Sequence, residues 1–179
     1  MPLVLLLGGA RSGKSEHALR LAREQTAPVV FVATGEAGDD EMTARIDQHR
    51  RERPTTWQTI EEPLQLRETL ETIDENSCVI VDCLTLWAAN ALDRLGAVHA
   101  ETQAGAAAAT AAARAGLTIA VSNEVGLGLV PDNPLGRSYR DLLGRVNTLW
   151  ADAAERAYLL VAGRALPLTK TDALQELLP

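Results

Sequence analysis

A glycine-rich loop near the N-terminus carries the first recognisable chemistry of this sequence. Residues 8–15 read Gly-Gly-Ala-Arg-Ser-Gly-Lys-Ser and match the pattern G-x-x-x-x-G-K-[ST] at every fixed position. Such a loop surrounds phosphates with backbone N–H groups, while its lysine binds the β- and γ-phosphates and its last hydroxyl binds Mg²⁺. We therefore predict a nucleoside triphosphate site made by Gly8, Gly9, Ala10, Arg11, Ser12, Gly13, Lys14 and Ser15.

A carboxylate that could complete the metal side follows another apolar run. The segment Val79-Ile-Val-Asp82 has the length of a strand and ends in an acid. A phosphate loop of this kind works with a carboxylate from the end of a second strand. Asp82 is therefore predicted to bind Mg²⁺ together with Ser15. The alternative is that Asp82 is an ordinary helix N-cap, because a helix is expected directly after it.

A histidine between basic residues suggests a nucleophile. Residues 39–53 begin with acids, end before a proline and are expected to form one helix. Met42, Ile46, His49 and Arg53 are spaced to share its inward face. The cations around the imidazole, Arg50, Arg51 and Arg53, would favour its neutral form and attract a phosphate. The alternative is a packed helical histidine without a catalytic role.

Apolar runs of strand length alternate with helical stretches along the chain. Strands are expected at Leu3–Leu7, Val29–Ala33, Val79–Asp82, Leu117–Ser122 and Tyr158–Ala162. Helices are expected near Lys14–Gln25, Asp40–Arg53, Leu64–Ile73, Leu84–Leu95, Ala100–Ala115 and Leu135–Arg156. The alternation predicts an α/β P-loop fold of RecA-like type, with three layers and a mainly parallel central sheet. We expect one domain over residues 1–179, in which Leu166–Pro179 adds an edge strand and a last helical turn.

Composition limits the classes of partner and compartment. The formal net charge of −7 argues against a duplex nucleic acid, whose binding depends on Lys and Arg. The sequence has no apolar run of about 20 residues and begins with a strand rather than a charged leader, which predicts a cytoplasmic protein. Cys78 and Cys83 fit neither a zinc nor a redox spacing and are expected to be buried free thiols.

Further motifs follow the loop in a fixed order, as far as about Gly163. The first group comprises Val32-Ala-Thr34, Asp40-Glu-Met42, Arg45-Ile46 with His49, Arg53-Pro54, Trp57 and Glu61. The second comprises Asp82-Cys-Leu-Thr85 with Asn90, Ser122-Asn-Glu-Val-Gly126 with Gly128, Val130-Pro131 and Asn133, and Arg140-Asp141 with Gly144-Arg-Val-Asn147. With these motifs the chain resembles the bifunctional adenosylcobinamide kinase/adenosylcobinamide-phosphate guanylyltransferases of cobalamin biosynthesis.

The resemblance implies two reactions and a role for each group. The γ-phosphoryl of ATP or GTP would pass to the aminopropanol hydroxyl of adenosylcobinamide, with Lys14 and Mg²⁺ stabilising the charge. His49 would then take GMP from GTP as a covalent phosphoramidate and give it to adenosylcobinamide phosphate. Besides the loop, the implied nucleotide contacts are Thr34, Arg50, Arg51, Glu52, Arg53, Glu61 and Asp82. The resemblance also implies a homo-oligomer, with a trimer as the form of the family.

Two other functions fit parts of the sequence. A P-loop small-molecule kinase would use the loop and leave His49 without a covalent role. A nucleotide-switched interaction module would use the loop for regulation, and it offers no reason for the His49 and arginine cluster. Glu124 stands after an expected strand end, where it could orient substrate or metal or serve as a structural carboxylate.

Overall fold

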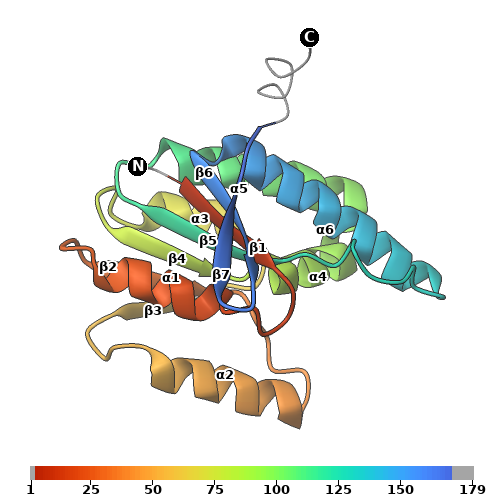
Figure 1. Cartoon of the computed structure of the whole chain (residues 1–179), viewed down its shortest axis with the longest axis horizontal. Coiled ribbons are helices and arrows are strands. Elements are labelled where there is room, and N and C mark those ends of the chain that lie inside the picture. Colours follow the sequence, from red (N-terminus) through yellow and green to blue (C-terminus); the bar gives the residue numbers. More distant parts are fainter. Residues whose placement is uncertain (1–2, 171–179) are drawn as a thin grey trace.

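The apolar runs of the sequence form the central strands of a sheet. The structure is a computed structural model that describes residues 3–170, and it shows a seven-stranded sheet between helices (Figure 1). The strands are β1 (Leu3–Gly8), β2 (Val29–Ala33), β3 (Gln58–Glu61), β4 (Cys78–Asp82), β5 (Thr118–Asn123), β6 (Arg156–Val161) and β7 (Arg164–Leu168). Their spatial order is β3-β2-β4-β5-β1-β6-β7, and neighbours are parallel except for the antiparallel pair β6 and β7. The predicted mainly parallel α/β sheet is therefore confirmed.

Helices cover the two faces of the sheet unequally. The helices are α1 (Lys14–Arg23), α2 (Asp40–Glu52), α3 (Leu66–Thr72), α4 (Leu84–Leu95), α5 (Ala97–Ala113) and α6 (Pro134–Ala153). One core lies between the sheet and α3 to α6, and it contains Trp87 and Trp150. The other core lies under α1 and contains Phe31. Because both faces are covered, the central strands are mostly apolar, and all of β1 is buried.

The alanine-rich helix α5 is a cover helix, as expected from its composition. Its buried positions are Ala100, Ala104, Ala107, Ala108 and Ala111, which pack in the core shared with α3, α4 and α6. Small side chains on this face let the helices approach one another closely. Among residues 3–170, no helix is both long and apolar enough to cross a bilayer.

Two strands complete the sheet at its edges. β3 was not anticipated, because its four residues are largely exposed and too few to show a periodic pattern. β7 supplies the edge strand expected in the tail, although it begins earlier, at Arg164, and pairs with β6. The expected last helical turn lies in residues 171–179, outside the described residues. That residues 1–179 form one domain stays a prediction.

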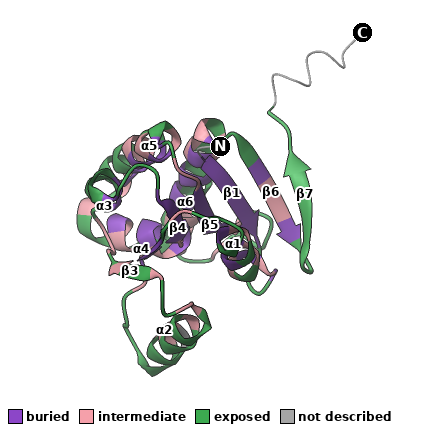
Figure 2. Cartoon of the chain, turned by 90° about the vertical axis from the view of Figure 1, so that its left-hand side faces the viewer, coloured by how far each residue is buried: buried purple, intermediate pink, exposed green. Residues whose placement is uncertain are grey.

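The strand register brings the functional segments to one edge of the sheet. Gly8 pairs with Asn123, Ala33 pairs with Asp82, and Ala33 also pairs with Glu61 on its other side. Because the strands are parallel, these residues are all carboxyl-terminal ends, where open α/β sheets bind their ligands. Figure 2 shows that α2 lies beyond this edge, apart from the other helices, with most of its surface exposed.

A buried arginine holds the turn between α3 and β4. The Arg114 side chain donates to four backbone carbonyls, those of Leu70, Ile73, Asp74 and Ser77, at 2.7 to 3.1 Å. Arg114 is 7% exposed and donates to carbonyls of the buried residues Leu70, Ile73 and Ser77, whereas the Asp74 carbonyl also accepts from the Ser77 N–H at 3.0 Å. Arg114 thus joins the end of α5 to the segment that leads into the strand of Asp82.

We expect Arg114→Met to lower the free energy of unfolding by about 3 kcal/mol, because it leaves several buried carbonyls without partners. Urea unfolding followed by circular dichroism measures this loss. Arg145→Met is the matched control, because Arg145 forms an exposed ion pair with Glu101 at 2.7 Å and should cost no more than about 1 kcal/mol. Equal losses in the two variants would contradict the structural role of Arg114.

Candidate active site

The glycine-rich loop has the backbone geometry of a phosphate cradle. Gly13 has a φ of 95° where α1 begins, a conformation that L side chains rarely adopt. At Gly8, a Cβ would lie 2.3 Å from the carbonyl oxygen of Leu160, so β6 leaves no room for a side chain there. The turn between β6 and β7 supports the loop through a hydrogen bond from Gly163 N–H to the Ser12 carbonyl at 3.0 Å. The loop therefore opens α1 in the form that binds phosphate oxygens.

Lys14 lies folded back over this loop. Its ammonium group donates to the Gly9 carbonyl at 2.6 Å and lies 3.4 Å from the Ser12 hydroxyl. The residue is only 6% exposed. A cation in this position faces the place where the β- and γ-phosphates lie in P-loop enzymes.

Asp82 is a largely buried carboxylate, with 11% of its side chain exposed, and it faces several donors. Burial raises the pKa of Asp82, while a hydrogen bond from Ser15 and the charges of His49, Arg53 and Lys14 oppose the rise. The N-cap of α4 is Cys83, so the structure does not use the Asp82 side chain as the ordinary helix cap that the sequence left open. The carboxylate is instead directed toward the phosphate loop and α2.

Ser15 and Asp82 form a suitable site for Mg²⁺. The hydroxyl and the carboxylate are hydrogen-bonded to each other, so both oxygens point to one place. Mg²⁺ is commonly held by one or two protein oxygens, with phosphates and water completing its shell. Within residues 3–170 there is no group of three or more acidic, His or Cys side chains that would form an all-protein metal site. Ser15 and Asp82 could supply such protein oxygens to a Mg²⁺ that arrives with the nucleotide.

His49 lies on the side of α2 that faces the sheet edge. Its Nδ1 atom is 4.0 Å from Oδ2 of Asp82, and its side chain is 33% exposed. Met42 and Ile46 on the same face are half-buried. The distance is longer than a hydrogen bond, and the exposure leaves the ring open to a ligand. The structure thus brings His49 to the phosphate-loop end of the sheet, 33 residues before its acidic neighbour in the sequence.

The arginines near His49 have different partners. Arg50 forms an ion pair with Glu61 of β3, and Arg51 donates to the Asp47 carbonyl at 3.2 Å on an exposed face of α2. Arg53 lies over the ring of Phe31, 3.6 Å from its centroid. The three arginines therefore have different partners, and their contacts with nucleotide stay predictions.

Arg53 is the arginine most suited to bind an anion. Its Nε and Nη1 atoms are buried and have no hydrogen-bond partner among the described residues. Burial lowers the pKa of Arg53, and the nearby charge of Asp82 opposes this change. Buried N–H donors without partners are costly, so a phosphate that accepted from them would stabilise the site.

Glu52 lies with Arg51 on the outer part of the helix. Its side chain accepts from Gln48 at 3.1 Å, and its carbonyl accepts from Arg23 of α1 at 3.2 Å. These bonds fix the end of α2 and do not direct the Glu52 carboxylate toward Asp82. Nucleotide contacts by Arg51 and Glu52 stay predictions.

Polar bonds behind the site fix the strand ends. The Thr34 hydroxyl is fully buried and both donates to the Cys83 carbonyl at 2.6 Å and accepts from the Cys83 N–H at 2.8 Å. Asn90 of α4 donates to the Thr34 carbonyl at 2.9 Å. Thr34 is therefore positioned at the site with its hydroxyl already engaged, and its contact with nucleotide stays a prediction.

A second set of bonds joins β5 to α4 and α6. The Asn123 N–H donates to the Thr85 hydroxyl at 2.7 Å, and Asn147 donates to the Asn123 carbonyl at 3.0 Å. Ser122 donates to Asn147 at 2.6 Å. The sequence identified Thr85, Asn90 and Asn147 only as motif members. Their supporting role depends on contacts between helices that no local pattern reveals.

The two cysteines do not supply a competing nucleophile. Both are free thiols, and Cys78 is buried. Burial raises the pKa of each thiol to about 11, so both stay protonated near neutral pH.

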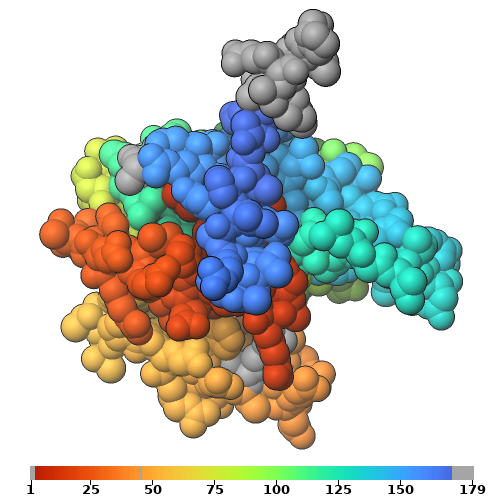
Figure 3. All heavy atoms as spheres, in the orientation of Figure 1, coloured from red at the N-terminus to blue at the C-terminus, as the bar shows by residue number. Residues whose placement is uncertain are grey.

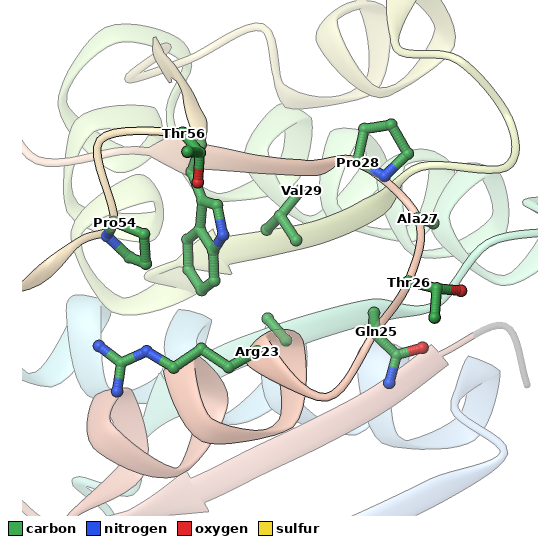
Figure 4. A pocket seen from close by; sticks show the side chains of 10 residues that line it. Arg23, Gln25, Thr26, Ala27, Pro28, Val29, Pro54 and Thr56 are labelled. Carbon is green, nitrogen blue, oxygen red and sulfur yellow. The ribbon is translucent and has the colours of Figure 1, made fainter.

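A cavity lies at the other end of the sheet. Its volume is about 450 Å³, and it lies between the end of α1, the start of β2 and the segment after α2 (Figure 4). Arg23, Pro28, Pro54 and Trp57 are among the residues that line it. Because Val29 begins β2, this cavity is remote from the strand ends that carry Gly8 and Asp82.

The family follows from comparison with known proteins. Residues 4–168 match the model of the family described as cobinamide kinase / cobinamide phosphate guanyltransferase. The chain belongs to this family. The resemblance drawn from the motifs is therefore confirmed, including the class of enzyme.

Curated relatives agree over nearly their whole length. The bifunctional adenosylcobalamin biosynthesis protein CobP of Pseudomonas aeruginosa is 45% identical over 92% of this chain and 95% of the relative. The proteins named CobU of Escherichia coli K12 and Salmonella typhimurium LT2 are 38% and 39% identical, each over 90% of this chain and 96% of the relative.

Solved structures support the fold alone. A protein of Pyrococcus horikoshii OT3 matches with a TM-score of 0.59 at 10% identity, over 93% of this chain and 85% of its own. An ATPase of a bacterial type III secretion system matches with a TM-score of 0.54 at 15% identity, over 98% of this chain and 53% of its own. The likeness to an ATPase agrees with the predicted P-loop fold.

We expect Asp82→Asn to lower Mg²⁺-dependent turnover by at least about tenfold while nucleotide binding changes much less, because the carboxylate acts through the metal. Turnover measured over a range of Mg²⁺ concentrations, beside nucleotide titration, tests this. Asp93→Asn on the exposed side of α4 is the control for charge. If nucleotide binding collapsed and extra Mg²⁺ had no effect, Asp82 would be a structural residue.

Proposed function

We propose that this chain phosphorylates the aminopropanol hydroxyl of adenosylcobinamide and then transfers GMP from GTP to the product through a histidine intermediate, giving adenosylcobinamide-GDP. The observation that carries the proposal is the placement of His49 Nδ1 4.0 Å from Asp82, a residue that also bonds to Ser15 of the phosphate loop. The candidate nucleophile and the triphosphate site thus lie at the same edge of the sheet. The family and its named relatives support the same pair of reactions.

The first reaction needs positioning and charge compensation more than covalent chemistry. The loop N–H groups and Lys14 hold the phosphates of ATP or GTP, and Arg53 supplies buried donors that have no partner among the described residues. When bound with the nucleotide at Ser15 and Asp82, Mg²⁺ supplies charge neutralisation at the phosphate oxygens. The residues of the site then orient the γ-phosphoryl group for attack by the acceptor hydroxyl.

The second reaction needs a protein nucleophile. A ring nitrogen of His49 bonds to the α-phosphorus of GTP, the bond to the bridging oxygen breaks, and pyrophosphate leaves. Since Nδ1 faces Asp82, the other nitrogen, Nε2, is the atom we assign to the attack. The phosphate of adenosylcobinamide phosphate then displaces the histidine. Covalent catalysis separates a difficult displacement between two anions into two easier steps.

We also propose that the enzyme works as a homo-oligomer, a trimer in the form implied by the resemblance, in the cytoplasm. The segment between β5 and α6 exposes large apolar side chains, with Leu127 85%, Leu129 97% and Val130 66% exposed. Figure 3 shows this segment and the start of α6 extending beyond the rest of the molecule. Exposed apolar groups of this kind favour association. Two free thiols and the use of nucleoside triphosphates support a reducing, cytoplasmic compartment.

We expect the purified protein to be oligomeric in light scattering after gel filtration, and a Leu129→Ser, Val130→Ser double variant to dissociate, because it removes exposed apolar surface from the proposed contact. Val98→Ser is the control, since Val98 is 77% exposed on α5, away from this segment. A wild-type monomer at micromolar concentration would contradict the proposal.

We expect His49→Ala to lose the covalent GMP adduct and guanylyl transfer while it still phosphorylates adenosylcobinamide from ATP, because only the transfer of GMP needs a protein nucleophile. Mass spectrometry after incubation with GTP labelled on the α-phosphate detects the adduct. A phosphoramidate should disappear in acid and survive alkali, whereas an ester to Ser or Thr would withstand the acid.

His99→Ala is the matched control, because His99 is an exposed histidine of α5. It should retain the adduct. An adduct that persisted in His49→Ala would move the nucleophile to another residue. No adduct in the wild-type protein, together with phosphorylation of a small molecule, would favour the kinase without guanylyl transfer.

A further inference from the structure

Glu124 lies directly beside the phosphate loop. It follows β5, the strand that the sheet order places between β1, which leads into the loop, and β4, which ends at Asp82. Its N–H donates to the Gly8 carbonyl at 3.1 Å. The Glu124 backbone therefore lies between the phosphate loop and Asp82. Neither reaction described above assigns a role to Glu124.

The Glu124 carboxylate is held in place by the turn that follows. Its Oε1 atom accepts a hydrogen bond from the Gly126 N–H. A Cβ on Gly126 would lie 2.8 Å from this oxygen, so the glycine leaves room for the carboxylate. The backbone just before Glu124 is fixed by bonds from Asn123 to Thr85 and from Asn147 to Asn123. Because the backbone is fixed and the side chain is half-buried, the Glu124 carboxylate has few alternative orientations.

Two carboxylates stand at this edge of the sheet. Asp82 faces Ser15, His49 and Arg53 and is the one assigned above to Mg²⁺. Glu124, by contrast, is held through its Oε1 atom by a backbone N–H of its own turn. Its second oxygen can therefore accept a proton from a substrate.

Phosphoryl transfer requires such a group on the acceptor side. The attacking and leaving oxygens lie roughly in line through the γ-phosphorus, and the loop with Lys14 holds the leaving side. A hydroxyl that attacks phosphorus must lose its proton, and a positioned carboxylate takes this role in many enzymes.

We propose that Glu124 is the general base of the phosphoryl-transfer reaction, a role that rests on the kinase activity proposed above. The acceptor hydroxyl oxygen bonds to the γ-phosphorus, and its proton passes to the Glu124 carboxylate. The bond between the γ-phosphorus and the bridging oxygen breaks, and its electron pair leaves with the nucleoside diphosphate. Glu124 then returns the proton to water. The formation of the histidine adduct has no acceptor hydroxyl and does not use this base.

Glu124→Gln separates the chemical role from a structural one. Glutamine keeps an oxygen that accepts from Gly126 N–H, but it does not take a proton at neutral pH. We expect the rate of adenosylcobinamide phosphorylation from ATP to fall about 10²- to 10⁴-fold, while the covalent GMP adduct forms from GTP at the wild-type rate. The phosphorylation rate of Glu124→Asp should lie between those of the wild type and of Glu124→Gln, because aspartate keeps the carboxylate on a shorter side chain. Asp132→Asn, a charge change at an exposed position of the same segment, should leave both rates unchanged.

Three results would overturn the assignment. Near-normal phosphorylation by Glu124→Gln, with an active wild-type enzyme, would show that Glu124 is not the base and would leave the proposed function standing. Equal loss of phosphorylation and adduct formation, or recovery of phosphorylation with excess Mg²⁺, would indicate that Glu124 binds the nucleotide or the metal instead. A wild-type protein with neither activity would refute the proposed function, and the role of Glu124 with it.

Discussion

A carboxylate that is largely buried at the end of a central strand needs partners for its charge, and the arrangement around Asp82 follows from that constraint. Ser15 donates to it, and Lys14, His49 and Arg53 lie near enough for their charges to oppose the effect of burial on its pKa. Each of these groups comes from a different part of the chain. The phosphate loop, the helix with His49 and the strand of Asp82 are therefore coupled electrostatically, because a change in one alters the charge that the others face.

The precision of this arrangement depends on the backbone at the strand ends. Thr34 joins the end of β2 to Cys83, while Thr85 and Asn147 hold Asn123 from two sides. Buried polar groups are costly unless they are paired, and once paired they fix one geometry. The sheet edge therefore presents its phosphate loop, Asp82 and Glu124 from rigid elements. His49 comes from α2, whose surface is largely exposed and which stands apart from the other helices (Figure 2).

Much of the fold was open to prediction because its signals are local. The strands β1, β2, β4, β5 and β6 coincide with apolar runs, since a parallel strand that is buried on both faces needs apolar residues throughout. The helix α4 was expected with its observed bounds, Leu84–Leu95. β3 escaped prediction because it is short and exposed and forms only by pairing with β2. In the sequence, Arg50, Arg51 and Arg53 form one basic cluster. In the structure they contact different elements, namely β3, α2 and β2, respectively.

The sequence by itself determined the phosphate loop, the strand-ending acid, the helix that carries His49 and the family, because each depends on residue types at short and regular spacing. Only the tertiary structure decided that His49 Nδ1 lies 4.0 Å from Asp82, that Arg53 lies over Phe31, and that Glu124 starts beside Gly8. These relations depend on strand order. β5 enters the sheet between β1 and β4 although it follows both in the chain, and the order of a parallel sheet is set by packing over long sequence separations.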